Sequence, residues 1–419
     1  MSSNATHQPP KRGSRRGSSS SSGRRGPRAS APSAPEPTTL DYETAVFDPA
    51  PIAFETLQLD PRLLSGIRDL GWTETRSVQS GVIPLALAAN DVIACAETGT
   101  GKTAAFLVPI LQRFLTEAPP GRVAATRALV LAPTRELAVQ IEDQVQGLTY
   151  HTGISSVAVY GGVPMTIQEQ ALKAGVDIIV ATPGRLMDHM RHDSVKFTGL
   201  EVLVLDEADR MLDMGFWPDV QRILSALPKE RQTLLFSATM PAEVLRLTKE
   251  FLRAPKFVQV GVRGGPAKTI THAIQEVAAH EKMQWLAKWI REVSAGPVLV
   301  FCRTKVGADR LATRLNSMGI RTAALHADRT QQQRMSAMEG FRTGDFPVLV
   351  ATDVAARGLD IDGIAHVVNF EVPDTPEAYV HRVGRTGRAE TTGSALTLVS
   401  PEEVRALRAL EKAVGVQLQ

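Results

Sequence analysis

Short apolar runs, each followed by a polar or glycine-rich turn and an amphipathic stretch, recur along the chain from about residue 90 onwards. Consecutive apolar positions are typical of strands buried on both faces of a parallel sheet, and the amphipathic stretches predict helices that cover it. The first series of runs reads DVIACA, RALVLAP, SVAVYGG, DIIVATP, EVLVLDE and QTLLFSAT; the second reads GPVLVFC, RTAALHA, FPVLVAT, AHVVNFE and GSALTLVS.

The segment GVRGGPAKT separates the two series, and its glycines and proline predict an interdomain linker. We therefore predict a tail over residues 1–48, one α/β domain over 49–260, a linker over 261–270 and a second α/β domain over 271–419. Each domain should be a parallel sheet flanked by helices. Functional sites are expected at the carboxyl ends of the strands.

Composition narrows the class of protein. The chain is 43% hydrophobic and 22% charged, as in ordinary globular proteins, and its length favours two to three domains. It contains neither an apolar run long enough to cross a membrane nor the apolar segment of a secretory signal, so we predict a cytoplasmic protein without membrane contact. Cys95 and Cys302 lie inside apolar runs and are interpreted as buried core residues.

Positive charge is concentrated at the N-terminus. Residues 1–40 carry seven Lys and Arg residues against Glu36 alone, although the net charge of the whole chain is only +3. The Ser, Gly, Pro and Arg content of this tail predicts disorder, because too little apolar surface is present to offset the ordering entropy. The tail is either a solubilising leader or a loose electrostatic arm for a polyanion such as RNA.

The sequence AETGTGKT, residues 96–103, follows one apolar run and precedes a helical stretch. It departs from the phosphate-loop pattern GxxxxGK[ST] only in its first residue, Ala96. Glycines let backbone N–H groups approach phosphates, Lys102 can reach the terminal phosphate oxygens, and the Thr103 hydroxyl can ligate Mg²⁺. A structural turn is the alternative, but the order of strand, loop, Lys-Thr and helix favours nucleotide binding.

A second candidate is VLVLDEAD, residues 202–209. The strand ends at Asp206, where a carboxylate can hold a metal ion, and Glu207 can orient and deprotonate an attacking water. Such acidic pairs are more often solvated loop residues. The phosphate loop elsewhere in the chain favours the catalytic interpretation.

Near the end of the chain, HRVGRTGR places three arginines and a histidine in residues 381–388. Fixed positive charge at this density predicts an anionic partner. These motifs, in this order, strongly resemble those of the DEAD-box RNA helicases, and the style is similar to the bacterial RhlE-like branch. The resemblance also rests on Phe54, Gln79, PTREL (133–137), GG (161–162), TPGR (182–185), SAT (237–239), VFC (300–302), Gln331 with Arg334, and TDVAARGLD (352–360).

The resemblance implies two RecA-like domains, the cofactors ATP and Mg²⁺, ATP-dependent binding to the RNA backbone, and local strand separation. For the nucleotide it implies that Gln79 reads the adenine edge, that Phe54 stacks near the base, and that Asp360 contacts the ribose. It further implies that the phosphates are bound by Thr98, Gly99, Thr100, Gly101, Lys102 and Thr103, and that the metal ion is bound by Thr103 and Asp206. Arg76 departs from the family, which usually has a threonine there that ties this motif to the phosphate loop.

For RNA the resemblance implies contacts to phosphates and sugars, hence binding that is independent of base sequence. Singly, such residues are more often helix caps or surface ion pairs. Arg385 and Arg388 resemble arginine fingers for the triphosphate held by the other domain, so hydrolysis would require domain closure. The expected RNA contacts are Thr134, Arg135, Gly161, Gly162, Thr182, Arg185, Arg334 and Thr352, and the expected coupling residues are Ser237, Thr239, His381 and Arg382.

The predicted function is an RNA-dependent ATPase that unwinds short duplexes. An ATP-gated RNA clamp and a translocating DNA helicase are the alternatives. The expected partner is RNA, as single strands and short duplexes, and ribosomes or RNA-degradation machinery are candidate assemblies. We expect a monomer, and, because the chain ends soon after the last predicted strand, no appended RNA-binding domain.

Overall fold

The computed structural model describes residues 42, 44–97, 99–117, 126–260, 270–292, 296–356, 363–387 and 392–414. Residues 1–41 of the predicted tail and residues 261–269 of the predicted linker lie outside this part of the chain. Ile270, which the sequence assigned to the linker, is the first residue of a strand.

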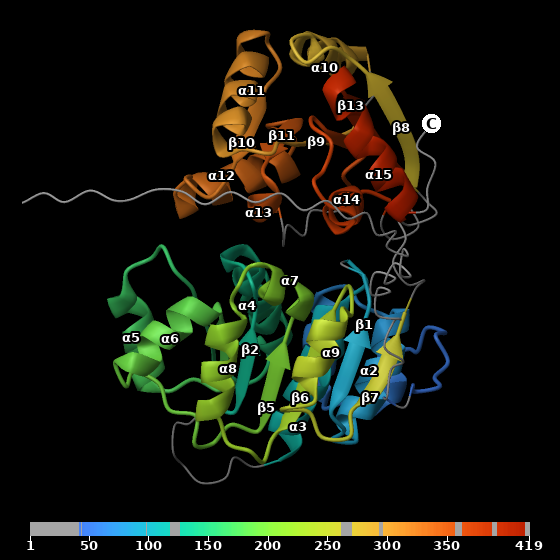
Figure 1. Cartoon of the computed structure of the whole chain (residues 1–419). Helices are drawn as coiled ribbons and strands as arrows, with labels where there is room; N and C mark the ends of the chain where they lie inside the picture. Colours follow the sequence, from blue (N-terminus) through green and yellow to red (C-terminus); the bar gives the residue numbers. More distant parts are fainter. Residues whose placement is uncertain are drawn as a thin grey trace, which may run out of the picture. The chain divides into compact units, whose positions relative to one another are not determined.

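The first domain is built on a seven-stranded sheet in the order β3-β4-β2-β5-β6-β1-β7 (Figure 1). All neighbouring strands are parallel. The sequence predicted six of these strands and missed β7, a short segment in which polar residues flank two apolar ones. The strands are β1 (Val92–Cys95), β2 (Ala128–Leu131), β3 (Ser156–Val159), β4 (Ile178–Ala181), β5 (Val202–Leu205), β6 (Gln232–Ser237) and β7 (Lys256–Gln259).

Helices cover both faces of this sheet, because successive strand side chains point in opposite directions. Val92 and Ala94 of β1 belong to the core under the N-terminal helices, whereas Ile93 belongs to the opposite core. The first face is covered by η1 (Phe54–Leu57), α1 (Pro61–Asp69), α2 (Ser77–Leu87), α3 (Lys102–Thr116) and α4 (Arg135–Thr149); the second is covered by α5 (Met165–Ala174), α6 (Pro183–Arg191), α7 (Ala208–Asp213), α8 (Trp217–Ala226) and α9 (Ala242–Thr248).

The second domain contains a six-stranded parallel sheet in the order β10-β11-β9-β12-β13-β8. Again the core lies on both faces, with Val298 and Val300 on one side and Leu299 and Phe301 on the other. Its strands are β8 (Ile270–Glu276), β9 (Val298–Phe301), β10 (Thr322–Leu325), β11 (Val348–Ala351), β12 (His366–Asn369) and β13 (Gly393–Val399). Its helices are α10 (Lys282–Glu292), α11 (Lys305–Ser317), α12 (Gln331–Arg342), α13 (Asp353–Ala356), α14 (Pro376–Val383), η2 (Pro401–Glu403) and α15 (Val404–Val414).

The predicted pair of parallel α/β sheets is confirmed. In chain order, strands β8 to β13 repeat the arrangement of β1 to β6, so the two sheets share one topology. The sequence missed β8, because its apolar residues are interrupted by polar ones. Cys302 is buried as predicted, whereas Cys95 is only partly buried, and neither forms a disulfide.

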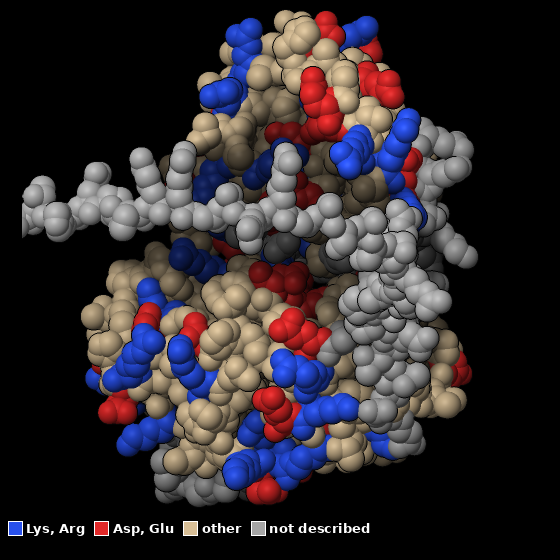
Figure 2. Space-filling view, in the orientation of Figure 1, with Lys and Arg blue, Asp and Glu red and all other residues tan. Residues whose placement is uncertain are grey.

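Two further features of the described residues bear on membrane association and on the attraction of a polyanion. In the part of the chain that the structure describes, no helix combines the length and apolar character needed to cross a membrane. Figure 2 shows Lys and Arg side chains interspersed with Asp and Glu over the visible face of the first domain. Attraction of a polyanion to this face therefore depends on particular side chains rather than on a uniform positive field.

Candidate functional site

The loop between β1 and α3 has the backbone that a phosphate loop needs. Gly99 and Gly101 adopt φ values of +83° and +89°, which residues with a Cβ rarely adopt. Gly101 is the N-cap of α3, and no side chain caps this helix end, so its first N–H groups can face an anion. Thr100 folds back and donates to the carbonyl of Glu97 at 2.7 Å. Thr98 lies outside the described residues.

Lys102 is buried at this helix start, with 6% of its surface exposed. Its Nζ donates to the carbonyl oxygen of Ala96 at 3.1 Å. A neutral carbonyl does not neutralise a buried ammonium; the carboxylates that follow β5 act on its charge, and a phosphate oxygen would supply a directly bonded anion. Thr103 follows it as the second residue of α3, as the predicted magnesium ligand should.

Two carboxylates follow β5 and are almost fully buried, with Asp206 2% and Glu207 5% exposed. Burial raises the pKa of Asp206 to about 7, against the opposing effect of the Lys102 charge. Burial is the largest single effect and acts to raise the pKa of Glu207, but nearby positive charges, Arg210 and Lys102 first among them, and a hydrogen bond from Arg210 together lower that pKa to about 2. Arg210 forms an ion pair with Glu207.

These two acids therefore have different protonation behaviour within one site. Glu207 is held ionised, and Asp206 is a carboxyl group that a nearby cation would readily ionise. The Asp206 carboxylate and the Thr103 hydroxyl are oxygen ligands of the kind that suits Mg²⁺, which keeps several waters and binds substrate phosphates as well. The described residues contain no cluster of three or more His, Cys, Asp or Glu side chains that could hold a metal by themselves.

The predicted contact between the SAT and DEAD segments is present. Oδ2 of Asp209 accepts hydrogen bonds from the backbone N–H and the hydroxyl of Thr239, at 2.8 and 2.7 Å. The Ser237 hydroxyl accepts from the N–H of Asp209 at 3.2 Å. Ser237 is the last residue of β6 rather than part of the following turn. The Ser237 hydroxyl also donates to the carbonyl of Thr239 at 2.6 Å, so the segment forms a local turn in addition to its contacts with Asp209.

The adenine-reading motif is tied directly to the phosphate loop. Gln79 accepts a hydrogen bond from the N–H of Arg76 at 2.8 Å and donates to the carbonyl of Gly101 at 3.0 Å. Arg76 itself donates from Nη1 to the carbonyl of Gly99 at 2.7 Å. The sequence predicted a weaker tie because threonine is replaced, but arginine provides one by its longer reach.

Phe54 has a different environment from the one that base stacking requires. Only 2% of it is exposed, and it belongs to the first core. Its ring centroid lies 6.5 Å from that of Trp72. The structure thus gives Phe54 a packing role under η1 and α1, and no face of its ring is open to a base.

The predicted RNA contacts of the first domain gather at one sheet edge, because β3, β4 and β2 are neighbours. Thr134 is the N-cap of α4 and accepts from the N–H of Leu137. The Arg135 guanidinium lies across the glycine pair, where a Cβ on Gly161 would come within 3.3 Å of Nη2. Gly162 has a φ of +91°. Gly162 is therefore needed here, because a Cβ on it would also come within 2.3 Å of Nη1 of Arg135, whereas a Cβ on Gly161 would require only a small shift of that side chain.

Arg185 is held by residues that the sequence did not single out. Its Nη1 donates to the carbonyl of Val163 at 3.0 Å and to Oε1 of Gln168 at 3.1 Å. Gln168, in turn, donates to the carbonyl of Tyr160 at 3.0 Å. Oε1 of Gln168 also lies 3.3 Å from Nε2 of the fully buried His189. Burial lowers the pKa of His189, which favours the neutral ring.

Gln168 therefore links the glycine pair after β3 to the TPGR segment at the start of α6. Thr182 is the N-cap of that helix and is buried. A glutamine in the middle of a helix carries no signal of its own in sequence. Its role becomes visible only when the fold brings α5 beside α6.

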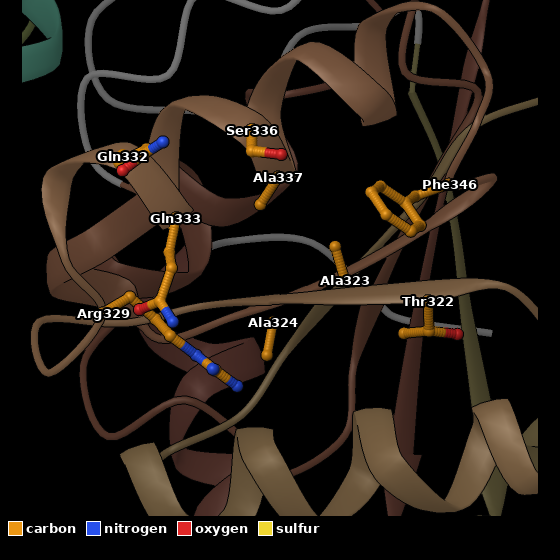
Figure 3. Close-up of a pocket in the computed structure, with 9 residues that line it drawn as sticks. All are labelled: Thr322, Ala323, Ala324, Arg329, Gln332, Gln333, Ser336, Ala337 and Phe346. Carbon is orange, nitrogen blue, oxygen red and sulfur yellow. The ribbon is translucent and has the colours of Figure 1, made fainter.

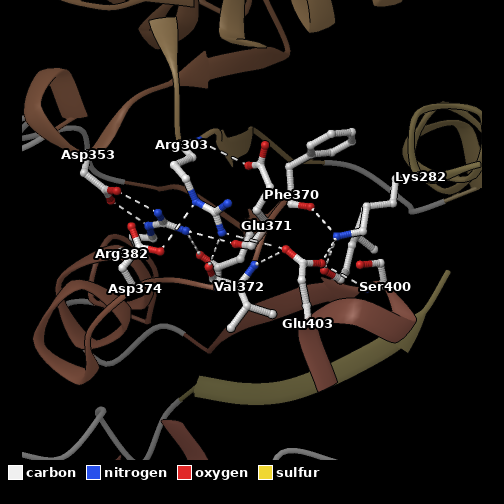
Figure 4. Close-up of polar contacts among 12 residues, drawn as sticks. Lys282, Arg303, Asp353, Phe370, Glu371, Val372, Asp374, Arg382, Ser400 and Glu403 are labelled. Atoms are coloured by element: carbon white, nitrogen blue, oxygen red, sulfur yellow. Dashed lines mark hydrogen bonds and ion pairs between the residues drawn. The ribbon is translucent and has the colours of Figure 1, made fainter. Parts of the chain in front are cut away.

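In the second domain, Arg382 is the centre of a buried polar network (Figure 4). Its Nε and Nη2 donate to the two oxygens of Asp353, both at 2.6 Å. Nη1 donates to Oδ1 of Asn369 at 3.1 Å and to the carbonyl of Glu371 at 3.3 Å. The sequence predicted a securing role for Arg382, but it did not identify Asp353 as its partner.

The structure describes some of the remaining predicted site residues and leaves out others. Arg385 and His381 line one small hollow together with Arg382 and Asp353, so the described part of the arginine motif is contiguous. Arg334 lies in the first turn of α12, and Thr352 follows β11. Asp360 and Arg388 lie outside the described residues.

A cavity of about 460 Å³ lies beside the edge strand β10 and α12 in the second domain (Figure 3). It is lined by small β10 side chains, by Arg329 and Phe346, and by polar residues of α12. None of the predicted site residues lines it. The chemistry of this chain is therefore concentrated at strand ends rather than in this cavity.

Comparison with known proteins agrees with this geometry. The DEAD/DEAH box helicase family model matches residues 76–247, and the helicase conserved C-terminal domain model matches residues 281–390. The DEAD-box ATP-dependent RNA helicase CshA of Bacillus subtilis (strain 168) is 43% identical over 361 residues, which cover 86% of this chain and 72% of the relative. The chain belongs to the DEAD-box family of ATP-dependent RNA helicases.

Other relatives of this helicase refine the assignment. The ATP-dependent RNA helicase CshA of Listeria monocytogenes is 41% identical over 366 residues, covering 87% of this chain and 69% of the relative. These relatives carry the name CshA, so the predicted RhlE-like branch is not supported. The family assignment itself and the RNA-dependent ATPase activity are confirmed.

Solved structures match the helicase over both domains and confirm the RecA-like folds. S. cerevisiae Dbp5 bound to RNA and ADP BeF3 has a TM-score of 0.78 at 32% identity, covering 87% of this chain and 94% of that one. Mss116p bound to ssRNA and AMP-PNP has a TM-score of 0.81 at 28% identity, covering 91% and 81%. Both are complexes with RNA and an ATP analogue.

Proposed function

We propose that this helicase hydrolyses ATP at the carboxyl ends of strands β1 and β5 of the first sheet. Lys102 would hold the phosphates, and Glu207 would act on the attacking water. The observation that carries the proposal is the burial of a lysine at an uncapped helix start near two buried carboxylates of opposite pKa shift. Such divergent pairs are typical of catalytic sites.

Mg²⁺ fits the same edge. Asp206 and the Thr103 hydroxyl would hold the ion, which would neutralise developing negative charge on the phosphates. Gln79 would give preference for adenine by offering one donor and one acceptor to the base edge. Asp360 would contact the ribose.

RNA would be bound through its backbone, without reading of the bases. Arg135 and Arg185 present guanidinium groups beside exposed glycine backbone, which is chemistry suited to phosphate oxygens. In the second domain Arg334 and Thr352 would add contacts to the same strand. This supports local unwinding of short duplexes or remodelling of RNA–protein complexes.

Arg385 and Arg388 would act as arginine fingers on the triphosphate, and Ser237, Thr239, His381 and Arg382 would couple hydrolysis to RNA binding. Because fingers and phosphate loop belong to different domains, hydrolysis would require domain closure. RNA that contacts both domains would favour the closed state and so stimulate hydrolysis.

The cellular setting is also part of the proposal: a monomeric cytoplasmic enzyme, with ribosomes or RNA-degradation machinery as candidate assemblies. Its domains would span 49–260 and, because Ile270 begins β8, 270–419. Cross-linking of the protein to RNA in its own cell, followed by sequencing of the bound RNA, would identify the substrate class.

The direct test of the site is Glu207→Gln, which keeps size and hydrogen bonding but removes the base. We expect RNA-stimulated ATPase to fall by about 10² to 10⁴, while ATP-dependent RNA binding persists. Glu243→Gln, on the exposed surface of α9, is the matched control. Parent-level turnover in Glu207→Gln would overturn the assignment.

Strand separation must be measured in the same experiment. A clamp and a helicase both bind RNA in an ATP-dependent way, but only a helicase separates a labelled short duplex. Comparison of ATPase stimulation by single-stranded RNA and DNA excludes or supports the DNA alternative.

A further inference from the structure

Arg76 stands where the adenine-reading motif of the family usually has a threonine, and the structure gives this arginine a defined contact. It is the N-cap residue of α2, and its exposed side chain reaches across to the phosphate loop. Nη1 donates to the carbonyl oxygen of Gly99 at 2.7 Å.

Gln79, three residues later, makes the second contact from α2 to the same loop. Its Nε2 donates to the carbonyl of Gly101 at 3.0 Å, and its Oε1 accepts from the N–H of Arg76 at 2.8 Å. Both ends of the amide are therefore engaged within the protein. An amide that reads adenine must offer a donor and an acceptor to the base, so at least one of these bonds has to be exchanged.

The two bonds of Gln79 differ in what their removal would affect. The bond from Arg76 N–H belongs to the capping box of α2 and stabilises the helix start. The bond to Gly101 holds the loop at a glycine with a φ of +89°, directly before Lys102. Exchange of the second bond for adenine would release the loop at the residue that positions the phosphate-binding lysine.

We propose that Arg76 is a positioning residue that determines nucleotide specificity: its bond to Gly99 keeps the phosphate loop anchored to α2 while Gln79 exchanges Gly101 for the adenine edge. This inference rests on the proposed role of Gln79. Guanidinium donors form charge-assisted hydrogen bonds, which are stronger than those of a neutral amide. Among the described residues, Arg76 and Gln79 are the α2 side chains with hydrogen bonds to this loop.

The consequence is specific to adenine. A guanine nucleotide offers the amide no matching edge, so Gln79 keeps its bond to Gly101 and the loop stays anchored without Arg76. An adenine nucleotide requires the exchange and depends on the second anchor. Removal of the Arg76 side chain should therefore weaken adenine nucleotides selectively, whereas general damage to the loop would weaken both classes equally.

The experiment measures ADP and GDP binding to the full chain by calorimetry, in the presence of Mg²⁺ and without RNA, so that hydrolysis does not interfere. For Arg76→Ala we expect the Kd for ADP to rise about tenfold, the size of one charge-assisted hydrogen bond. The Kd for GDP should change by less than about twofold. Arg76→Lys, which retains a charged donor, should recover part of the preference for ADP.

Two controls accompany these variants. Arg68→Ala removes an exposed arginine of α1 whose partner is Glu55, and it should leave both affinities unchanged. Thermal unfolding of each variant checks that the domain remains folded. Equal weakening of ADP and GDP in Arg76→Ala, or no weakening of either, overturns the proposal.

Gln79→Ala separates this proposal from the function on which it rests. If Gln79→Ala does not reduce the preference for ADP over GDP, the adenine-reading role itself is wrong. If Gln79→Ala reduces it and Arg76→Ala does not, the role of Gln79 stands and only the inference about Arg76 fails.

Discussion

The two sheets of this helicase share one strand order, but the buried lysine that follows the first strand has different hydrogen-bond partners in the two domains. In the first domain β1 leads to α3, which begins at Lys102; in the second, β8 leads to α10, which begins at Lys282. Both lysines are buried. The positions correspond because β8 to β13 repeat the order of β1 to β6.

The partners of the two lysines decide what each domain can do. Nζ of Lys102 has the neutral carbonyl of Ala96, whereas Nζ of Lys282 lies 2.5 Å from Oε2 of Glu403 and also donates to the carbonyls of Phe370 and Leu398 (Figure 4). Burial is the largest single effect and acts to raise the pKa of Glu403, but the bond and charge of Lys282 and the hydrogen bonds from Ser400 together lower the pKa.

Lys282 is thus hydrogen-bonded to a carboxylate of its own domain, whereas the hydrogen bond of Lys102 goes to a neutral carbonyl, as the proposed phosphate site requires. The segment between β8 and α10, residues 277–281, contains no glycine, whereas the loop before α3 contains two at positive φ. One topology can therefore host a nucleotide site or a structural ion pair, depending on a few residues after the first strand.

If the second domain contributes to hydrolysis only through its arginines, Arg385→Lys should have the largest effect. Lysine keeps the charge but not the planar fork that spans phosphate oxygens. We expect RNA-stimulated kcat to fall by roughly 10³ to 10⁵, with nearly unchanged ATP affinity in the absence of RNA. The measurement is kcat together with the RNA concentration for half-maximal stimulation. Weaker RNA binding with normal kcat would instead identify an RNA-phosphate contact.

Removing the internal anion of the second domain tests the comparison directly. Glu403→Ala leaves a buried ammonium unpaired, so we expect the free energy of unfolding of this domain to fall by about 3 to 5 kcal/mol. Lys282→Met/Glu403→Leu replaces the pair by apolar groups and should recover most of that stability. Chemical denaturation measures both variants. A second nucleotide-binding site in Glu403→Ala would contradict the view that the glycine loop is also needed.

A smaller effect is expected in the first domain for the link between Gln168 and Arg185. Arg185→Ala and Gln168→Ala should each raise the RNA concentration for half-maximal ATPase by about tenfold, because Gln168 acts through Arg185. The double variant should be no worse than Arg185→Ala alone. Gln170→Ala, an exposed glutamine on the same helix, is the control. Additive effects of the two substitutions would show that Gln168 acts independently of Arg185.

The smallest effect is expected from deletion of residues 1–40. Maximal ATPase should be unchanged, and RNA affinity should fall modestly with a flatter dependence on salt. Each RNA phosphate that the tail neutralises contributes about 0.7 to the steepness of the log–log plot for single strands, and deletion would remove that contribution. Identical affinity and slope in the truncated protein would favour the solubilising leader over the electrostatic arm.

Sequence reasoning predicted most of the strands, because consecutive apolar residues report burial on both faces. It missed β7 and β8, whose mixed polarity reflects positions at the sheet edges. It also singled out candidate phosphate and metal residues, since phosphate and metal chemistry restrict residue type and spacing. It could not find Gln168, Arg210 or Asp353, which act by contact with another side chain and so depend on the packing of separate elements.

The backbone conformation of Glu207 is unfavourable for stability, although its side chain is the proposed catalytic group. Its backbone has φ +52° and ψ +54°, a left-handed conformation that costs a residue with a Cβ about 1 kcal/mol. A search for thermostabilising substitutions would favour glycine or asparagine here, and either would remove the carboxylate. Engineering a hardier version of this enzyme should therefore leave this residue untouched and seek its gains at positions remote from the strand ends.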